Sequence, residues 1–299
     1  MQISDESRPE KIKYGAVENP APGIRRVLAQ NPGPFTYHGT GTYLIGKGEV
    51  AVIDPGPFLP GHINNILGAL EPGEVITHIL ITHTHADHSP GARLLKTFTN
   101  AATFGFGPHG GCADNTDSME AGIDRDFVPD FELEDGEILR GENWEIEAVH
   151  TPGHCSNHLC FAYLNENTLF CGDHLMAWST TVILPPDGNM QDYLKSLEKL
   201  TLRKEQIYWP THGPSITDPH QVINQTISHR KQRIEQIQSA LGRTRATLSE
   251  LRKQLYPDTP PELHTAAEYS ILASIGYLIE KGNVVCEAPG DWSSNFFAV

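Results

Sequence analysis

The spacing of apolar residues between positions 41 and 213 predicts a mixed fold built from short strands and helices. Alternating or unbroken apolar runs predict strands at 41–56 (a hairpin with its turn at Gly46–Gly48), 77–82, 144–151, 158–164, 168–173 and 206–213. Helical spacing predicts helices at 62–70, 92–98 and 191–200. Because strands and helices alternate twice over, we expect sheets covered by helices on their outer faces.

After Gly213 the pattern becomes helical and then closes in a hairpin. Asp218 and Pro219 fit the start of a long helix that ends at Gly242. Its apolar face consists of Ile223, Ile227, Ile234, Ile237 and Leu241. A capping box at Thr247 and Glu250 predicts a second helix, a third is expected over about 262–281, and two short strands end the chain. This order is that of a winged helix, so we predict two domains, 1–215 and 216–299. A helical appendage packed on the main domain is the alternative.

Four strong metal ligands lie within six positions directly after the strand predicted at 77–82. The segment H-x-H-x-D-H contains His83, His85, Asp87 and His88. Because side chains alternate along extended backbone, His83 and His85 point to the same side. A catalytic zinc takes three protein ligands and keeps one position open, so four ligands exceed the needs of one ion. They would suit two neighbouring ions if further ligands came from elsewhere in the chain.

Three later segments offer these further ligands, each at the end of a predicted strand and beside a small or turn-forming residue. They are His154 in TPGHC, Asp173 in FCGDH and His212 in WPTHG. A single histidine among the 15 of this chain is usually a packed or surface residue. The combination of four ligand segments at strand ends, however, is what a metal site on the rim of a sheet requires.

At these residues the sequence resembles the metallo-β-lactamase superfamily. The resemblance covers THTHADH, TPGH, GDH and THG in this order, with VIDPG near the start. It implies an α+β fold, a four-layer αβ/βα sandwich, followed here by the small winged-helix domain. It also implies that His83, His85 and His154 hold one metal, that Asp87, His88 and His212 hold another, and that Asp173 bridges the two. Asp54, in VIDPG, would brace the ligand loop from behind.

The cofactors that the resemblance implies are two zinc ions, with iron or manganese as alternatives. Two such ions lie about 3.5–4 Å apart and share a hydroxide. This hydroxide is a nucleophile near neutral pH because zinc lowers the pKa of bound water to about 7. It would attack an ester-type or phosphodiester bond. Asp87 is the candidate catalytic residue that holds or accepts the proton of the nucleophile.

The substrate class stays open among several hydrolases. The second half of the chain, from GDHLMAW onward, resembles the lactamase-β-like protein 2 group, which implies a metal-dependent hydrolase and includes single-strand endoribonucleases. A thioesterase of the glyoxalase II type or a lactonase is an alternative, because these branches also carry an aspartate at the bridging position. β-Lactamases proper do not, so weak or promiscuous β-lactamase activity is a lesser alternative. The last is a non-catalytic nucleic-acid binder that uses the winged helix.

Several residues near the ligands in sequence are expected to support or line the site. Trp178 and Thr180 lie between Asp173 and the helix at 191–200 and are the candidates for the substrate pocket. His158 and His174 are expected to pack near the ligands or hold them in place. The cysteines that flank ligand segments are interpreted as small core residues: Cys155, Cys160 and Cys171.

The cysteines and the chain start predict a cytoplasmic protein. The five cysteines include no C-x-x-C pair and fit reduced thiols. Residues 1–15 have no apolar core, so neither a signal peptide nor a membrane anchor is expected there. No stretch reaches the roughly 18 apolar residues of a membrane span.

The net charge of −15 bears on the partners. From Ile216 onward 8 basic and 9 acidic side chains nearly balance, so the acidic surplus lies in the first domain. An acidic body repels phosphate backbones at long range, so duplex DNA is not an expected partner. A small ester or thioester, or single-stranded RNA, is the expected substrate. Arg230, Lys231 and Arg233 are the candidates to line a groove for a polymer, and a homodimer through the tail is left open.

Overall fold

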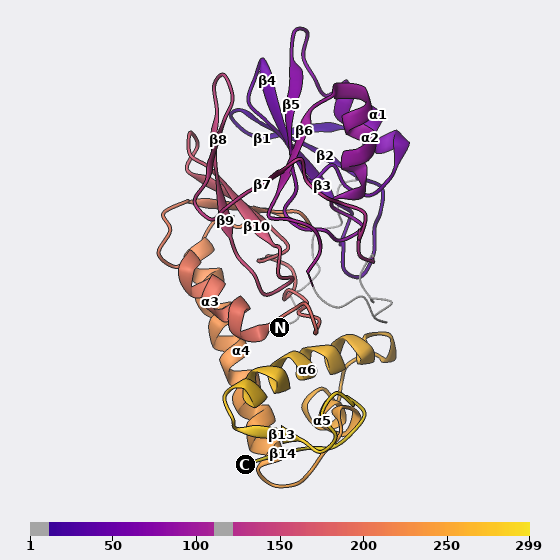
Figure 1. The fold of residues 1–299 in the computed structure, drawn as a ribbon, viewed down its shortest axis with the longest axis vertical. Helices are drawn as coiled ribbons and strands as arrows, with labels where there is room; N and C mark the ends of the chain where they lie inside the picture. The colour runs from indigo at the N-terminus through magenta and orange to yellow at the C-terminus, as the bar shows by residue number, and fades with distance from the viewer. Residues whose placement is uncertain (1–11, 111–121) are drawn as a thin grey trace.

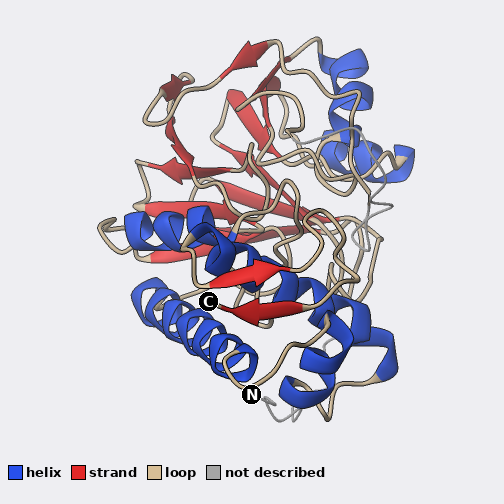
Figure 2. Cartoon of the chain, turned by 60° about the horizontal axis from the view of Figure 1, so that its bottom comes forward, coloured by secondary structure: helices blue, strands red, loops and turns tan. Residues whose placement is uncertain are grey.

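The computed structural model describes residues 12–110 and 122–299. Most of the N-terminal segment considered above, and Cys112, therefore lie outside the described residues. Within these ranges two large sheets stand side by side, and helices cover the outer face of each (Figures 1 and 2).

The first sheet has seven strands that follow one another in chain order. They are β1 (Val17–Ala21), β2 (Ile24–Leu28), β3 (Gly41–Ile45), β4 (Glu49–Ile53), β5 (Val75–Leu80), β6 (Ala102–Gly105) and β7 (Phe131–Glu132). The first four pair antiparallel, and β4 to β7 pair parallel. The parallel connections contain helices α1 (Pro60–Gly68) and α2 (Pro90–Thr99), which lie together on one side of the sheet (Figure 1). The hairpin between β3 and β4 turns at Gly46 and Gly48, both at positive φ, as expected.

The second sheet has five strands in the order β12-β11-β10-β9-β8. Their bounds are β8 (Ile138–Arg140), β9 (Glu145–His150), β10 (Leu159–Tyr163), β11 (Thr168–Gly172) and β12 (Ile207–Pro210). Only β11 and β12 pair parallel, because helix α3 (Met190–Leu200) connects them.

Three apolar cores separate the four layers and confirm the expected sandwich. Along β4, Val50 and Val52 face the core under α1 and α2, whereas Ala51 and Ile53 face the core between the sheets. Along β10, the alternation places Phe161 in the inter-sheet core and its neighbour Cys160 in the core under α3. The central strands β4 and β10 are thus apolar on both faces, which explains their nearly unbroken apolar runs in the sequence.

The C-terminal part follows the predicted order of elements. It consists of α4 (Pro219–Leu241), α5 (Leu248–Leu255), a 3₁₀ turn (Pro261–Leu263), α6 (His264–Glu280) and the antiparallel strands β13 (Val284–Cys286) and β14 (Phe296–Ala298). The Asp218 side chain caps α4 by accepting from the backbone N–H of Gln221, and Thr247 and Glu250 form the expected capping box. The third helix starts at His264 rather than 262, because Pro261 opens a separate 3₁₀ turn.

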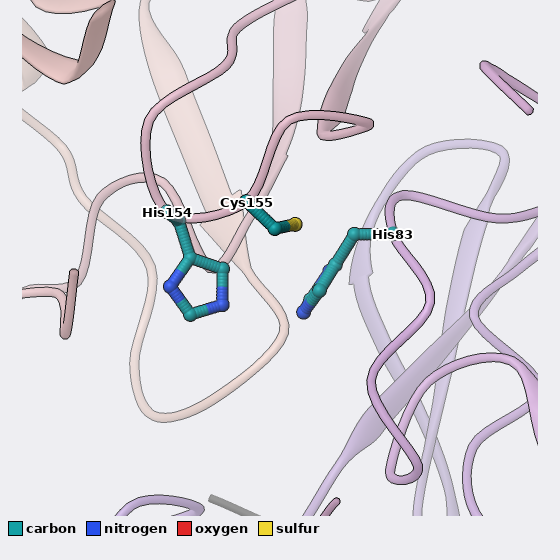
Figure 3. A group of neighbouring side chains, drawn as sticks. All are labelled: His83, His154 and Cys155. Atoms are coloured by element: carbon teal, nitrogen blue, oxygen red, sulfur yellow. The ribbon is translucent and has the colours of Figure 1, made fainter. Parts of the chain in front are cut away.

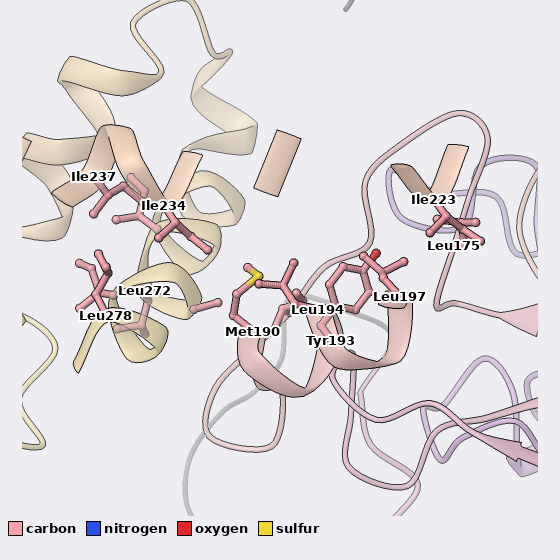
Figure 4. Close-up of a cluster of buried hydrophobic side chains, with 14 of the residues drawn as sticks. Leu175, Met190, Tyr193, Leu194, Leu197, Ile223, Ile234, Ile237, Leu272 and Leu278 are labelled. Carbon is pink, nitrogen blue, oxygen red and sulfur yellow. The ribbon is translucent and has the colours of Figure 1, made fainter. Parts of the chain in front are cut away.

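The core under α3 continues into the C-terminal part without a break. Tyr193 and Leu197 of α3, Ile223 and Ile237 of α4, and Leu272 of α6 belong to one cluster of buried side chains (Figure 4). The predicted boundary at residue 215 stays a prediction, but apolar packing crosses it. A chain that ended near Ile216 would expose the apolar face of α3 to water.

Four cysteines lie in the described residues and all are buried: Cys155, Cys160, Cys171 and Cys286. Among the described helices, none is long and apolar enough to cross a membrane.

We expect Leu197→Ala to destabilise the whole protein, because Leu197 is fully buried between α3 and the C-terminal helices. Truncation of a buried leucine costs about 2–5 kcal/mol. Urea unfolding measures this loss. The matched control is Leu202→Ala, whose side chain is 82% exposed and should change the free energy of unfolding by less than about 0.5 kcal/mol. Equal free energies of unfolding for Leu197→Ala and Leu202→Ala would contradict the shared core.

Candidate metal centre

The four ligand segments meet where strands of both sheets end. His83 follows β5 of the first sheet, whereas His154, Asp173 and His212 follow β9, β11 and β12 of the second. His88 lies just before the first turn of α2. All seven predicted ligand side chains are buried, and none is more than 8% exposed.

Three imidazoles form the first cluster. Nε2 of His83 lies 2.9 Å from Nδ1 of His85, which lies 3.1 Å from Nε2 of His154. The Sγ atom of Cys155 also faces His83 and His154, with all three ligand atoms within 4.8 Å of one another (Figure 3). Cys155 is buried, as expected, but it borders the cluster rather than only filling the core.

The second cluster pairs carboxylates with imidazoles. Nε2 of His212 lies 3.1 Å from Oδ2 of Asp87, and Nε2 of His88 lies 3.6 Å from Oδ1 of the same residue. Asp173 stands between the clusters. Its Oδ2 is 3.4 Å from Nε2 of both His88 and His212. The ligand atoms of Asp173, His83 and His88 all lie within 4.8 Å of one another.

The two clusters differ in charge: the first presents neutral imidazoles, whereas the second pairs ionised carboxylates with protonated imidazoles. Burial, and then the neighbouring histidines, hold the pKa of His83 and His85 well below 6.5, so both present neutral lone pairs. Burial opposes the charge of Asp87, but His88 and His212 outweigh it and lower its pKa to about 2. Burial likewise opposes the charge of His212, but Asp173 and Asp87 raise its pKa to about 10.

One further observation tests the fit of a metal. Oδ1 of Asp173 and Nε2 of His88 are buried and make no hydrogen bond within the described part of the chain. Such buried polar atoms are costly unless a partner satisfies them. Together with the neutral imidazoles and ionised carboxylates, they make a donor set that fits divalent metal ions of the zinc type.

Asp54 holds the ligand segments from behind. It ends β4 at φ 49°, and its carboxylate accepts from Thr82 N (2.8 Å), Thr82 Oγ1 (2.7 Å), Thr211 Oγ1 (3.1 Å) and His88 Nδ1 (2.9 Å). These donors come from both sheets and from the start of α2. Asp54 therefore sets the orientation of the His88 ring and ties the ends of β5 and β12 together.

Backbone carbonyls orient two more imidazoles. Nδ1 of His154 donates to the carbonyl of Val182 (2.7 Å), and Nδ1 of His212 donates to the carbonyl of Gly39 (3.2 Å). A donor at Nδ1 leaves Nε2 facing the cluster, as metal-binding histidines require. Backbone carbonyls carry no sequence signature, so the roles of the Val182 and Gly39 carbonyls leave no signal in the sequence.

His158 and His174, which were expected to support the ligands, differ in their contacts. His158 accepts from the backbone N–H of Asp173 (3.2 Å) and bonds Thr151 Oγ1 (2.9 Å), so it holds Asp173 in place. His174 is fully buried with no ring hydrogen bond among the described residues, and burial lowers its pKa to about 3. Its backbone carbonyl accepts from Tyr193 Oη, 2.9 Å away.

A pocket opens beside both clusters. Its lining includes His85, Asp87, Asp173 and His212, and also the predicted residues Trp178 and Thr180. Its apolar wall consists of Pro34, Phe35, Met176, Trp178 and Val182.

Gly213 makes room for one wall of this pocket. It adopts φ +90°, and a Cβ there would lie 2.4 Å from Cδ1 of Trp178. Nε1 of Trp178 donates to the carbonyl of His212, 3.2 Å away. The pocket wall is therefore attached to the same segment that supplies a predicted ligand.

A family model described as the Metallo-beta-lactamase superfamily matches residues 38–212, which hold every one of these ligand segments. The chain belongs to the metallo-β-lactamase superfamily. A second model, the Beta-lactamase associated winged helix domain, matches residues 247–292 and confirms the predicted winged helix.

Relatives in this superfamily match most of the chain. A lactamase-like protein of Aspergillus fumigatus is 30% identical over 290 residues, which cover 90% of this chain and 81% of that protein. An atrochrysone carboxyl ACP thioesterase of Aspergillus novofumigatus is 30% identical over 256 residues, covering 81% and 73%.

Solved structures show the same fold. A metallo-beta-lactamase family protein of Thermus thermophilus has a TM-score of 0.74 at 23% identity, covering 93% of this chain and 99% of that one. A beta-lactamase domain protein of Burkholderia ambifaria has a TM-score of 0.79 at 19% identity, covering 95% and 94%.

We expect Asp54→Asn to destabilise the metallo-β-lactamase domain, because an amide nitrogen would face donors that now share a carboxylate oxygen. Leaving a buried charged network without its partner costs about 3–5 kcal/mol. The matched control is Asp130→Asn, whose half-exposed carboxylate also accepts from Thr103 and a lysine; surface pairs contribute less than about 1 kcal/mol. Urea unfolding compares the two. A smaller loss for Asp54→Asn than for Asp130→Asn would contradict the role given to Asp54.

Proposed function

We propose that this superfamily hydrolase cleaves acyl thioesters or related esters, with two divalent metal ions held by the seven clustered side chains. His83, His85 and His154 would hold one ion, and Asp87, His88 and His212 the other, with Asp173 between them. Zinc is the proposed metal, and iron or manganese are alternatives. Bound there, the metals would supply a nucleophilic hydroxide and polarise the carbonyl of the substrate.

The residues of the chain would orient the metal ligands and accept a proton. Asp54, Val182 and Gly39 fix the rings of His88, His154 and His212 through their Nδ1 atoms. Asp87 lines the pocket and is ionised, because His88 and His212 lower its pKa to about 2. We propose that Asp87 accepts the proton of the attacking water, since its carboxylate faces the pocket beside both clusters.

The lining of the pocket is the observation that carries the choice of substrate. Its lining contains Phe35, Met176 and Trp178, and no lysine or arginine is among the described lining residues. An apolar wall stabilises an acyl chain or ring by burial, whereas the phosphates of an RNA strand are bound mainly by cationic side chains. The relatives named as thioesterases support the same choice.

The basic residues expected to line a polymer groove are engaged elsewhere. Arg230 is buried and donates to the carbonyl of Thr181. Arg233 donates to the carbonyl of Leu255, and Lys231 pairs with Glu198 at 3.4 Å. Arg230 is too buried to line such a groove, so the expectation is wrong for this residue. A groove along Lys231 and Arg233 stays a prediction, and single-stranded RNA is the second candidate substrate.

We expect the purified protein to bind two divalent ions per chain. Chelation should abolish hydrolysis, and addition of the metal should restore it. Asp87→Ala should lower kcat by about 10²–10⁴-fold, the usual contribution of a proton-transfer group. Asp173→Ala should lower the metal content as well. Metal analysis and steady-state kinetics measure both effects.

His220→Ala is the control for incidental binding, because His220 is an exposed histidine on α4. It should keep the metal content and activity of the natural sequence. Full hydrolysis by the metal-free protein would contradict the proposed chemistry.

We expect acyl thioesters with aromatic acyl groups to be better substrates than single-stranded RNA or penicillins. On a good thioester, kcat/KM should reach at least about 10⁴ M⁻¹s⁻¹. Trp178→Ala should raise KM for an aromatic acyl thioester more than for an acetyl thioester, because Trp178 forms the apolar wall. Trp292→Ala, at an exposed tryptophan in the C-terminal part, is the matched control. Faster cleavage of RNA than of every thioester would reject the proposal.

A further inference from the structure

The C-terminal part reaches the metal-site loop through one arginine. Arg230 lies in the middle of α4, far from the active site in sequence, yet its side chain is only 5% exposed. Its Nη2 donates to the backbone carbonyl of Thr181, and its guanidinium lies over the ring of Tyr193, 5.4 Å from the centroid. Thr181 lies in the segment between β11 and α3, and Tyr193 lies in α3 itself.

Thr181 connects Arg230 to one predicted metal ligand, Asp173. Its Oγ1 donates to the backbone carbonyls of Asp173 and His174, each 2.9 Å away. Tyr193, the other contact of Arg230, donates to the same His174 carbonyl. Arg230 therefore contacts two of the residues, Thr181 and Tyr193, that hold the backbone at Asp173 and His174.

The residues on either side of Thr181 connect Arg230 to a second ligand and to the pocket. The carbonyl of Val182 accepts from Nδ1 of His154 at 2.7 Å. Val182 and Thr180 both line the pocket. A shift of the backbone at Thr181 would therefore move an orienting carbonyl of His154 and part of the substrate wall together.

We propose that Arg230 is a positioning residue for the metal centre. Through this residue, α4 of the winged-helix region influences the affinity for metal and the position of the bound substrate. This inference rests on the proposed function, because it takes Asp173 and His154 as metal ligands. It gives the C-terminal part a role at the active site without a nucleic-acid partner.

Arg233 provides a matched comparison on the same helix. It too donates to a backbone carbonyl, that of Leu255, and lies over a tyrosine ring, 4.2 Å from the centroid of Tyr256. These partners belong to the C-terminal part, where Leu255 ends α5 and Tyr256 follows it. Loss of either arginine removes one such pair of contacts, but only loss of Arg230 should reach the metal centre.

The experiment titrates the metal-free full-length protein with Zn²⁺ in competition with a chromophoric chelator, and records the thermal midpoint of each variant. Arg230→Met should weaken Zn²⁺ binding by about tenfold, at the lower end of the roughly 10–100-fold effect of groups that orient metal ligands. Arg233→Met should bind Zn²⁺ like the natural sequence, even if its thermal midpoint falls as far. Arg230→Lys should recover most of the affinity, because an ammonium can also donate to the Thr181 carbonyl.

Equal Zn²⁺ affinities of Arg230→Met and Arg233→Met would overturn the inference. If Arg230→Met fails to fold, Thr181→Val replaces it, since it keeps the shape of the side chain but loses both hydrogen bonds. Unchanged Zn²⁺ affinity in Thr181→Val would also overturn the inference. If the natural sequence itself binds no Zn²⁺, Co²⁺, Fe²⁺ or Mn²⁺, the proposed function is wrong. This outcome is distinct from failure of the inference alone, in which the natural sequence binds metal and the two arginine variants do not differ.

Discussion

The carboxylate of Asp54 joins the two sheets at the edge where the histidines gather. It takes donors from Thr82 after β5, from Thr211 after β12 and from His88 before α2. Its backbone adopts a left-handed conformation at φ 49°, which is uncommon for a residue with a side chain. The carboxylate reaches the second cluster directly at His88. It reaches the first cluster through Thr82, whose Oγ1 also lies 3.0 Å from Nδ1 of His83. The positions of the other ligands depend on this junction.

Burial of so many ionisable groups at one edge has an energetic consequence. Asp87 and Asp173 are buried together and both stay ionised, because His88 and His212 stand between them. Buried carboxylates are costly unless a positive charge lies beside them. In the metal-free chain protonated imidazoles provide that charge, and divalent ions would replace these protons on binding. Metal binding and the stability of this edge are therefore expected to be coupled.

The C-terminal part belongs to the same folded unit as the sandwich. Its helices share a core with α3, and Arg230 reaches the segment between β11 and α3. This segment also supplies Trp178, Thr180 and Val182 to the pocket. The winged-helix region thus contacts this segment through packing and two hydrogen bonds, from Arg230 to Thr181 and from Asn189 to Glu280. Among the described residues, none of the winged-helix region lines the pocket.

The sequence by itself determined the strands that bury both faces, the capped helices and the set of ligand segments. These features depend on neighbours within a few residues, as in the H-x-H spacing of His83 and His85 or the capping box at Thr247. The pattern did not reveal the strand Ile24–Leu28, because Arg25 interrupts it. This arginine is buried only because Glu74 and the carbonyl of Ala69, which are distant in sequence, bind it. The tertiary structure alone decided such pairings, together with the carbonyls behind His154 and His212 and the contact of Arg230 with Thr181. Each joins groups that are distant in the chain, and a backbone carbonyl is the same at every position, so no local pattern encodes which one a side chain meets.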